Sequence, residues 1–293
     1  MLPVYREALF VFWDTRLKLG GIRLKKALSI AGSDCSGGAG IQADIKTFSA
    51  HGIFGMTVVT SVVAENTFRV TDYQDIRPDI IEKQIDDVFD DIPPDAVKIG
   101  MLSCSDTMIA VAGKLREWNP KNVVIDPVMY AKNGCALMEP SAIDTLIAKV
   151  APLADLITPN IPEAEKMTGT IIKTHDDMRQ AALRIHAMGC RAVVVKGGHS
   201  AGDAVDILFD GEIFYEYPAP RVDTKRTHGT GCTFSSAIAS NLALGMPVHK
   251  AVGRAKEYIN VAIINAPELG KGCGPTHHFY EMYKSYFGEE HYA

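Results

Sequence analysis

Short runs of β-branched and apolar residues alternate along the chain with amphipathic segments. The apolar runs predict strands at Ala27–Ala31, Met56–Ala64, Ala96–Gly100, Val123–Asp126, Asp155–Thr158 and Ala192–Lys196. Between them, apolar residues recur at helical spacing, which predicts helices over Gly40–His51, Pro78–Asp91, Ser105–Trp118, Pro140–Val150 and His175–Met188. Two or three further helices are expected to close the chain.

This alternation predicts an α/β fold in three layers, with a central, mostly parallel sheet flanked by helices on both faces. The pattern changes at AVDILFDGEIFYEYP, where Asp210-Gly211 between two β-rich runs predicts an antiparallel hairpin. No linker composition interrupts the pattern, so residues 27–293 are expected to form one domain. Residues 1–26 are interpreted as an N-terminal extension.

Composition narrows the function classes. The chain of 293 residues carries a net charge of −5, which argues against a nucleic-acid partner because phosphate backbones require a basic surface. The six cysteines form no CxxC pair, so a zinc site is not indicated and reduced thiols are expected. The apolar run Ala8–Trp13 is too short for a signal sequence or a membrane span, and a cytoplasmic location is expected.

Two glycine motifs match known signatures but lie in the wrong context. GHSAG at Gly198–Gly202 fits the hydrolase nucleophile elbow, yet a second strand rather than a helix is predicted after it. GAGIQA at Gly38–Ala43 fits the dinucleotide fingerprint, but five residues separate it from the preceding strand. The P-loop pattern does not occur in the sequence.

Two other features point to anion chemistry. The glycine loops SDCSGGAG and THGTGC each precede a predicted helix, whose free N–H groups attract anions, although glycine also merely permits tight turns. Asp126, Asn160, Glu163 and Lys196 follow predicted strands, where each alone would be an ordinary cap or turn residue. Together they supply carboxylates for a metal, a lysine for phosphate and a glycine cradle, as phosphoryl transfer requires.

At this point the sequence resembles the ribokinase-like superfamily, and within it the hydroxymethylpyrimidine/phosphomethylpyrimidine kinases of thiamine biosynthesis. The resemblance covers about residues 27–285. It rests on the segments AGSDCSGGAGIQADIKTFSAHG, KIGML, VVIDPVM, TPNIPEAE, VVVKGGH, THGTGCTFSSA and GPTHHF, in this order. It implies a homodimer that uses ATP and Mg²⁺ to phosphorylate 4-amino-5-hydroxymethyl-2-methylpyrimidine and then its monophosphate.

The resemblance also implies roles for matching positions. Gly229, Thr230 and Gly231 would form the anion hole, with Cys232 as the base. Asn160 and Glu163 resemble the element that organises magnesium, with Asp126 as a second metal-binding carboxylate. The residues expected around the ATP phosphates are Asp126, Lys132, Asn160 and Lys196. Those expected to line the pyrimidine pocket are Gly32, Asp44, Val63, Met101 and Val128.

Two positions carry the chemistry most directly. Cys232 stands where most ribokinase-like enzymes have aspartate, and a helix N-terminus is expected to lower its thiol pKa toward neutrality. Glu65 stands in VAENT where the family often shows glutamine, and it is expected to face the pyrimidine edge. Two alternatives stay open: a pyridoxal or pyridoxamine kinase of the same branch, and a non-catalytic pyrimidine sensor, which would not need the phosphate cradle.

Overall fold

The computed structural model describes residues 24–131, 134–198 and 204–288. Within these residues, nine strands form one sheet in the order β3-β2-β1-β4-β5-β6-β7-β8-β9. Their bounds are β1 Lys26–Asp34, β2 Phe54–Glu65, β3 Val70–Asp75, β4 Ala96–Ile99, β5 Val123–Ile125, β6 Leu156–Ile157, β7 Val193–Val195, β8 Asp206–Phe209 and β9 Phe214–Tyr217. The six neighbouring strands β2, β1, β4, β5, β6 and β7 are parallel, which confirms the predicted α/β sheet.

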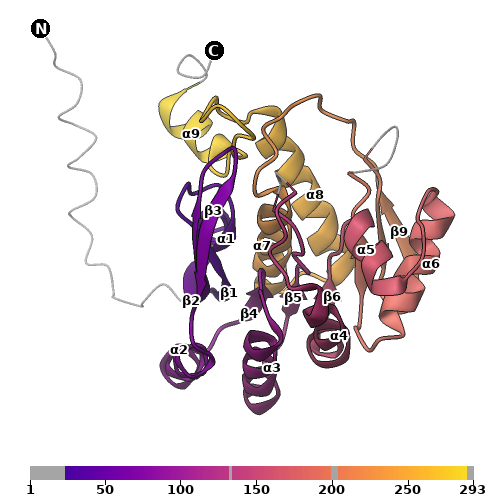
Figure 1. The fold of residues 1–293 in the computed structure, drawn as a ribbon. Helices are drawn as coiled ribbons and strands as arrows, with labels where there is room; N and C mark the ends of the chain where they lie inside the picture. The colour runs from indigo at the N-terminus through magenta and orange to yellow at the C-terminus, as the bar shows by residue number, and fades with distance from the viewer. Residues whose placement is uncertain (1–23, 132–133, 199–203, 289–293) are drawn as a thin grey trace, which may run out of the picture.

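Helices cover both faces of this sheet (Figure 1). Their bounds are α1 Gly40–Ala50, α2 Pro78–Asp91, α3 Ser105–Trp118, α4 Ile143–Thr145, α5 Ile161–Thr168, α6 His175–His186, α7 Thr230–Ala243, α8 Val248–Ile264 and α9 Tyr280–Phe287. The helix predicted over 140–150 is a continuous helical segment in which 3₁₀ turns and a π-helical turn surround α4. The predicted bounds of α2 and α3 are confirmed.

Alternating side chains of the strands supply two separate cores. Leu28 and Ile30 of β1 pack on the side covered by α2, α3, α5 and α6, whereas Ala27 packs on the side covered by α1, α7 and α8. Strands buried on both faces read as continuous apolar runs, which is why they were recognisable in the sequence. Because α7 packs on this second side, the glycine loop at its start lies against the sheet.

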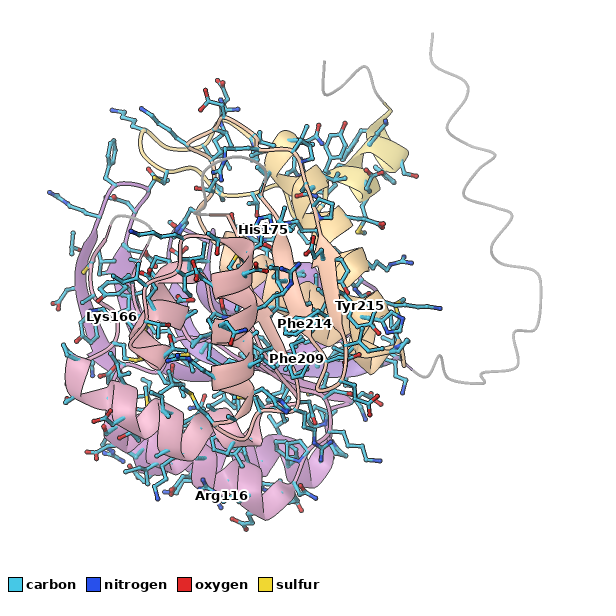
Figure 2. The ribbon with its side chains drawn as sticks, turned by 90° about the vertical axis from the view of Figure 1, so that its right-hand side faces the viewer. Arg116, Lys166, His175, Phe209, Phe214 and Tyr215 are labelled. Atoms are coloured by element: carbon cyan, nitrogen blue, oxygen red, sulfur yellow. The ribbon has the colours of Figure 1, made fainter. Side chains whose placement is uncertain are left out.

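The antiparallel pairs lie at the two ends of the sheet. The predicted hairpin is confirmed, because β8 pairs with β9 and Phe209 lies opposite Phe214 in the register. The two rings pack with centroids 4.7 Å apart beside α6 (Figure 2). At the other end, β3 pairs with β2 and was not predicted, since five of its six side chains are half-buried or exposed polar groups and Val70 is half-buried.

The parallel strands end at one edge of the sheet, and the loops that follow them carry the polar residues singled out above. Asp126 directly follows β5, Asn160 follows β6 and Lys196 follows β7. Asn160 and Lys196 are joined by an isolated parallel bridge, in which the Lys196 N–H donates to the Pro159 carbonyl at 2.8 Å. Residues from distant parts of the chain therefore converge at this edge.

Candidate active site

A cavity of about 650 Å³ opens at the carboxyl edge of the sheet. Most of the predicted site residues line it, and both glycine loops contribute to its wall. The predicted residues that line it are Gly32, Val63, Glu65, Met101, Asp126, Val128, Asn160, Glu163, Lys196, Gly229, Thr230, Gly231 and Cys232. Lys132, which was expected near the phosphates, lies outside the described residues.

The two glycine loops pack directly against each other. Gly229 is the N-cap of α7 with a φ of 73°, a conformation that favours glycine. A Cβ at Gly229 would lie 1.8 Å from the Gly38 carbonyl oxygen of the first loop, so no larger residue fits there. The second loop is thus held in place by the first, and the first turn of α7 faces the cavity.

Beside that turn lies a charged cluster. Lys196 Nζ donates to Asp126 Oδ1 at 2.6 Å, and both side chains are nearly buried. A Cβ on Gly231 would lie 3.0 Å from Asp126 Oδ2 and 3.4 Å from Lys196 Nζ, so the backbone of the loop approaches both groups closely. Burial alone would lower the pKa of Lys196, but the Asp126 and Glu163 carboxylates raise it above its usual value, and the ammonium stays charged.

Glu163 forms a reciprocal capping box with Asn160 at the start of α5. The Asn160 N–H donates to Glu163 Oε2 at 2.8 Å, and the Glu163 N–H donates to Asn160 Oδ1 at 2.9 Å. Burial raises the pKa of Glu163 to about 7, with a further contribution from Asp126 and an opposing one from Lys196. Glu163 therefore also acts as an ordinary capping carboxylate in the first turn of α5.

The position of Cys232 corrects one expectation. Burial raises the pKa of its thiol to about 11, and the opposing effects of the Lys98 ammonium and the Gly40 backbone N–H are smaller. The thiol is therefore neutral at pH 7, and the helix N-terminus does not bring its pKa to neutrality. A base has to be unprotonated, so the thiol must lose its own proton before it can accept the proton of a substrate hydroxyl.

Asp44 corrects a second expectation, because it does not line the cavity. Its side chain is fully buried, and Lys98 Nζ donates to both of its oxygens at 2.9 and 2.8 Å. Ser29 and Ser236 donate to the same carboxylate at 2.5 and 2.7 Å. The group links β1, β4, α1 and α7 underneath the site.

Sequence reasoning missed two residues that line the cavity beside Glu65. Asp34 ends β1, and His228 precedes the Gly-Thr-Gly loop. Their side chains form a hydrogen bond of 2.8 Å although the residues are 194 positions apart in the chain. Asp34 carried the same signal as Asp126, a carboxylate at the end of a buried strand, whereas nothing local marks its pairing with His228.

Comparison with known proteins places this geometry in a family. The sequence model of the family described as phosphomethylpyrimidine kinase matches residues 34–277. The chain belongs to that family. It is therefore a phosphotransferase, and the non-catalytic alternative and the dinucleotide motif have no support.

Relatives named as hydroxymethylpyrimidine/phosphomethylpyrimidine kinase match most of this chain. The protein from Rhizobium meliloti strain 1021 is 48% identical over 262 residues, which is 88% of this chain and 98% of the relative. The thiamine biosynthesis bifunctional protein ThiED of Geobacter sulfurreducens is 51% identical over 252 residues. That match covers 86% of this chain but 51% of the relative, so the chain spans about half of the bifunctional protein.

The solved structures that resemble this chain share its fold but carry the names of two different kinases. An ADP complex of Bacillus subtilis pyridoxal kinase superposes with a TM-score of 0.83 at 43% identity, covering 88% of this chain and 99% of that chain. Phosphomethylpyrimidine kinase from Clostridium difficile 630 gives 0.74 at 48% identity, covering 82% and 99%. These neighbours confirm the fold class, and the pyridoxal kinase names fit the alternative without outweighing the relatives named as hydroxymethylpyrimidine/phosphomethylpyrimidine kinase.

Proposed function

We propose that this enzyme transfers the γ-phosphoryl group of ATP to the hydroxymethyl group of 4-amino-5-hydroxymethyl-2-methylpyrimidine, and then phosphorylates the monophosphate, as in thiamine biosynthesis. The observation that carries the proposal is that Cys232 and the α7 loop line the same cavity as the Asp126–Lys196 pair. The names of relatives that the chain covers almost completely support the same substrate.

The residues divide the work of phosphoryl transfer among them. The N–H groups of the first turn of α7 and the Lys196 ammonium would stabilise charge on the transferred group. Cys232, in its thiolate form, would take the proton of the substrate hydroxyl as the new O–P bond forms. A loose transition state asks for little help from a base, so the small fraction of thiolate present near neutral pH is compatible with the reaction.

The donor set at the strand ends fits Mg²⁺. Asp126 and Glu163 supply carboxylate oxygens, which are the ligands that this ion prefers. Lys196 pairs with Asp126, and the pKa of Glu163 is raised mainly by burial and further by the Asp126 charge. Asp126 and Glu163 would hold the ion, which supplies charge neutralisation at the phosphates.

The homodimer and the cytoplasmic location stay predictions. No helix among the described residues is long and apolar enough to cross a membrane.

Exchanging Glu163 for glutamine tests this assignment. Glutamine can still accept the Asn160 N–H and keep the capping box, so Glu163→Gln should leave the melting temperature nearly unchanged. It removes a carboxylate, so the Mg²⁺ concentration for half-maximal activity should rise severalfold. Glu163→Ala is the matched control, because it should also destabilise the fold by about 0.5–1.5 kcal/mol through loss of the hydrogen bond that the Asn160 N–H donates to the Glu163 side chain. An unchanged Mg²⁺ dependence in Glu163→Gln would leave Glu163 only its capping role.

The substrate assignment is tested by identifying the product. The enzyme is incubated with Mg²⁺, ATP and the hydroxymethylpyrimidine, and mass spectrometry follows the pyrimidine with time. We expect the addition of one phosphoryl group followed by a second. A pyrimidine that stays unmodified while pyridoxal gains a phosphoryl group would replace the proposal by the pyridoxal kinase alternative, which the Bacillus subtilis structure favours by its name.

A further inference from the structure

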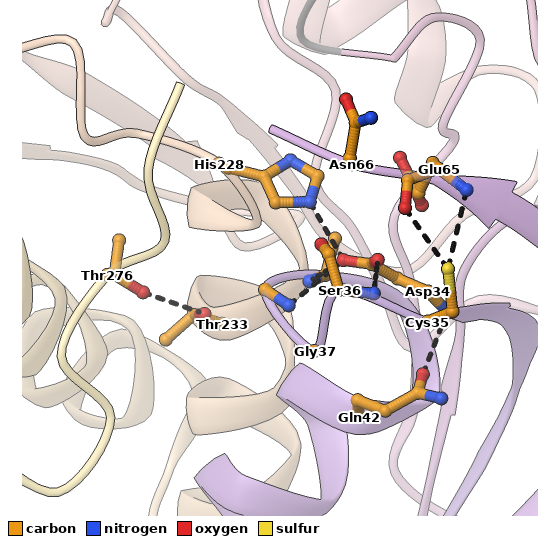
Figure 3. Close-up of polar contacts among 12 residues, drawn as sticks. Asp34, Cys35, Ser36, Gly37, Gln42, Glu65, Asn66, His228, Thr233 and Thr276 are labelled. Atoms are coloured by element: carbon orange, nitrogen blue, oxygen red, sulfur yellow. Dashed lines mark hydrogen bonds and ion pairs between the residues drawn. The ribbon is translucent and has the colours of Figure 1, made fainter. Parts of the chain in front are cut away.

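Three titratable side chains meet at the cavity wall next to the α7 loop. They are Asp34 at the end of β1, Glu65 at the end of β2, and His228 in the segment before α7. One oxygen or nitrogen atom of each lies within 4.8 Å of those of the other two (Figure 3). The mechanism of phosphoryl transfer described above uses none of them.

Asp34 is held as a carboxylate. Its Oδ1 accepts the Ser36 N–H at 2.7 Å, and its Oδ2 accepts the N–H groups of Gly38 and Ala39 at 2.9 and 2.7 Å. The ring Nε2 of His228 donates to the same Oδ2 at 2.8 Å. Burial opposes ionisation, but the hydrogen bonds from His228 and the loop hold the pKa of Asp34 well below its usual range. A fixed negative charge therefore stands beside Glu65.

Glu65 has a different environment. The titratable groups that face it are Asp34 from β1, His228 from the segment before α7, and the Cys35 thiol, which donates to the Glu65 carbonyl oxygen at 3.1 Å. The pKa of Glu65 is raised to about 7: burial is the largest cause, the charge of Asp34 and a hydrogen bond with it add to the rise, and His228 partly opposes it. The side chain lines the same cavity as Val63, close to the expected pyrimidine.

We propose that Asp34, which His228 holds as a carboxylate, acts through Glu65 to select the aminopyrimidine, because its fixed charge makes Glu65 present a carboxylic acid rather than a carboxylate to the substrate. This inference rests on the proposed function. The acid O–H would donate to the ring nitrogen, and its C=O would accept from the neighbouring amino group. That is the pattern a glutamine offers, so the glutamate here keeps the specificity of the family in a form that depends on pH.

The proton balance is simple. The complex holds one proton between a Glu65 oxygen and the ring nitrogen, and above the pKa of Glu65 this proton has to come from solvent. Binding of the pyrimidine should therefore weaken as pH rises through about 7, approaching a tenfold loss per pH unit. Pyridoxal presents no ring amino group beside its nitrogen, so its affinity should not fall in parallel, and the preference for the pyrimidine should shrink.

The same three residue types also ligate divalent cations. Here the Asp34 oxygens already accept four hydrogen bonds, three of them on Oδ2, so a metal would have to displace the contacts that hold the first glycine loop. The arrangement favours a fixed anion over a metal ligand. A metal is nevertheless a distinct outcome of the experiment.

Calorimetric titration without ATP tests the proposal, because the rate also depends on the Cys232 proton. The pyrimidine is added at about pH 8 in two buffers of different ionisation enthalpy. Wild type should take up close to one proton per pyrimidine bound, roughly 0.9 for a group with a pKa near 7. Glu65→Gln should take up none and bind with a Kd that does not change above neutrality. Asp34→Asn should move the pH of weakening downward, provided that the variant folds.

Several results would overturn the inference. Wild type that binds without proton uptake, or Glu65→Gln with the same uptake as wild type, would show that Glu65 is not the titrating group. Pyrimidine binding that is lost after dialysis against a chelator and restored by Zn²⁺ would assign the cluster to a metal instead. A wild type that neither binds nor phosphorylates the pyrimidine at any pH would overturn the proposed function itself, and this inference with it.

Discussion

Replacing Cys232 by serine should lower kcat by about 10²–10⁴-fold, the contribution of a general base. Serine has nearly the same volume, so substrate affinity and thermal stability should change little. The wild-type kcat should rise with pH through neutrality, because burial raises the thiol pKa to about 11 and makes proton loss unfavourable below it. The variant should show no such rise. Steady-state kinetics across the neutral range measure both effects.

The matched control is Cys104→Ser. Cys104 is the N-cap of α3 and lies outside the residues that line the cavity, and serine is a favoured residue at that position. Its kcat should equal that of wild type. If Cys232→Ser retained more than half of the wild-type kcat, Cys232 would not be the base, and the substrate hydroxyl would lose its proton to another group.

The largest effect on stability is expected for Lys98→Met. Lys98 and Asp44 form an ion pair of 2.8 Å in which both side chains are fully buried. Methionine fills similar space but leaves the Asp44 carboxylate without its cation, which costs about 3–5 kcal/mol in known buried pairs. Urea denaturation should show this loss in the free energy of unfolding.

Lys25→Met is the control for that experiment. Lys25 Nζ lies 2.9 Å from Asp95 Oδ1, but the lysine side chain is 48% exposed. An exposed pair contributes about 0–1 kcal/mol, so this variant should resemble wild type. Equal effects of the two substitutions would mean that the buried pair does not hold α1 and α7 beneath the site as its contacts indicate.

The fold was predictable where the burial of an element leaves a recognisable apolar pattern in its sequence. Strands such as β4 and β7 are buried on both faces and therefore appear as apolar runs, and the amphipathic α2 was recognised with its bounds. β3 was not predicted, because it lies at the edge of the sheet and exposes most of its side chains, so its sequence shows no apolar alternation. Edge strands are stabilised by pairing that a single segment does not reveal.

Most of the residues that line the cavity were predictable from the sequence, whereas their ion pairs and pKa shifts were less so. Asp126, Lys196 and Gly231 were brought together as expected, since the ends of parallel strands share one edge. The placement of Asp44 came from resemblance alone, and its pairing with Lys98 depends on two elements 54 residues apart. The direction of the Cys232 pKa shift depends on burial by the assembled loops, which no local motif encodes.

The central claim is that this cavity phosphorylates a hydroxymethylpyrimidine in preference to a vitamin B6 alcohol. A competition assay tests it most directly: equal concentrations of the pyrimidine and pyridoxal share limiting ATP near neutral pH, and the two phosphorylated products are quantified by mass spectrometry. The ratio of products gives the ratio of kcat/KM values. The account predicts that the phosphorylated pyrimidine dominates. Pyridoxal phosphate as the main product would contradict it.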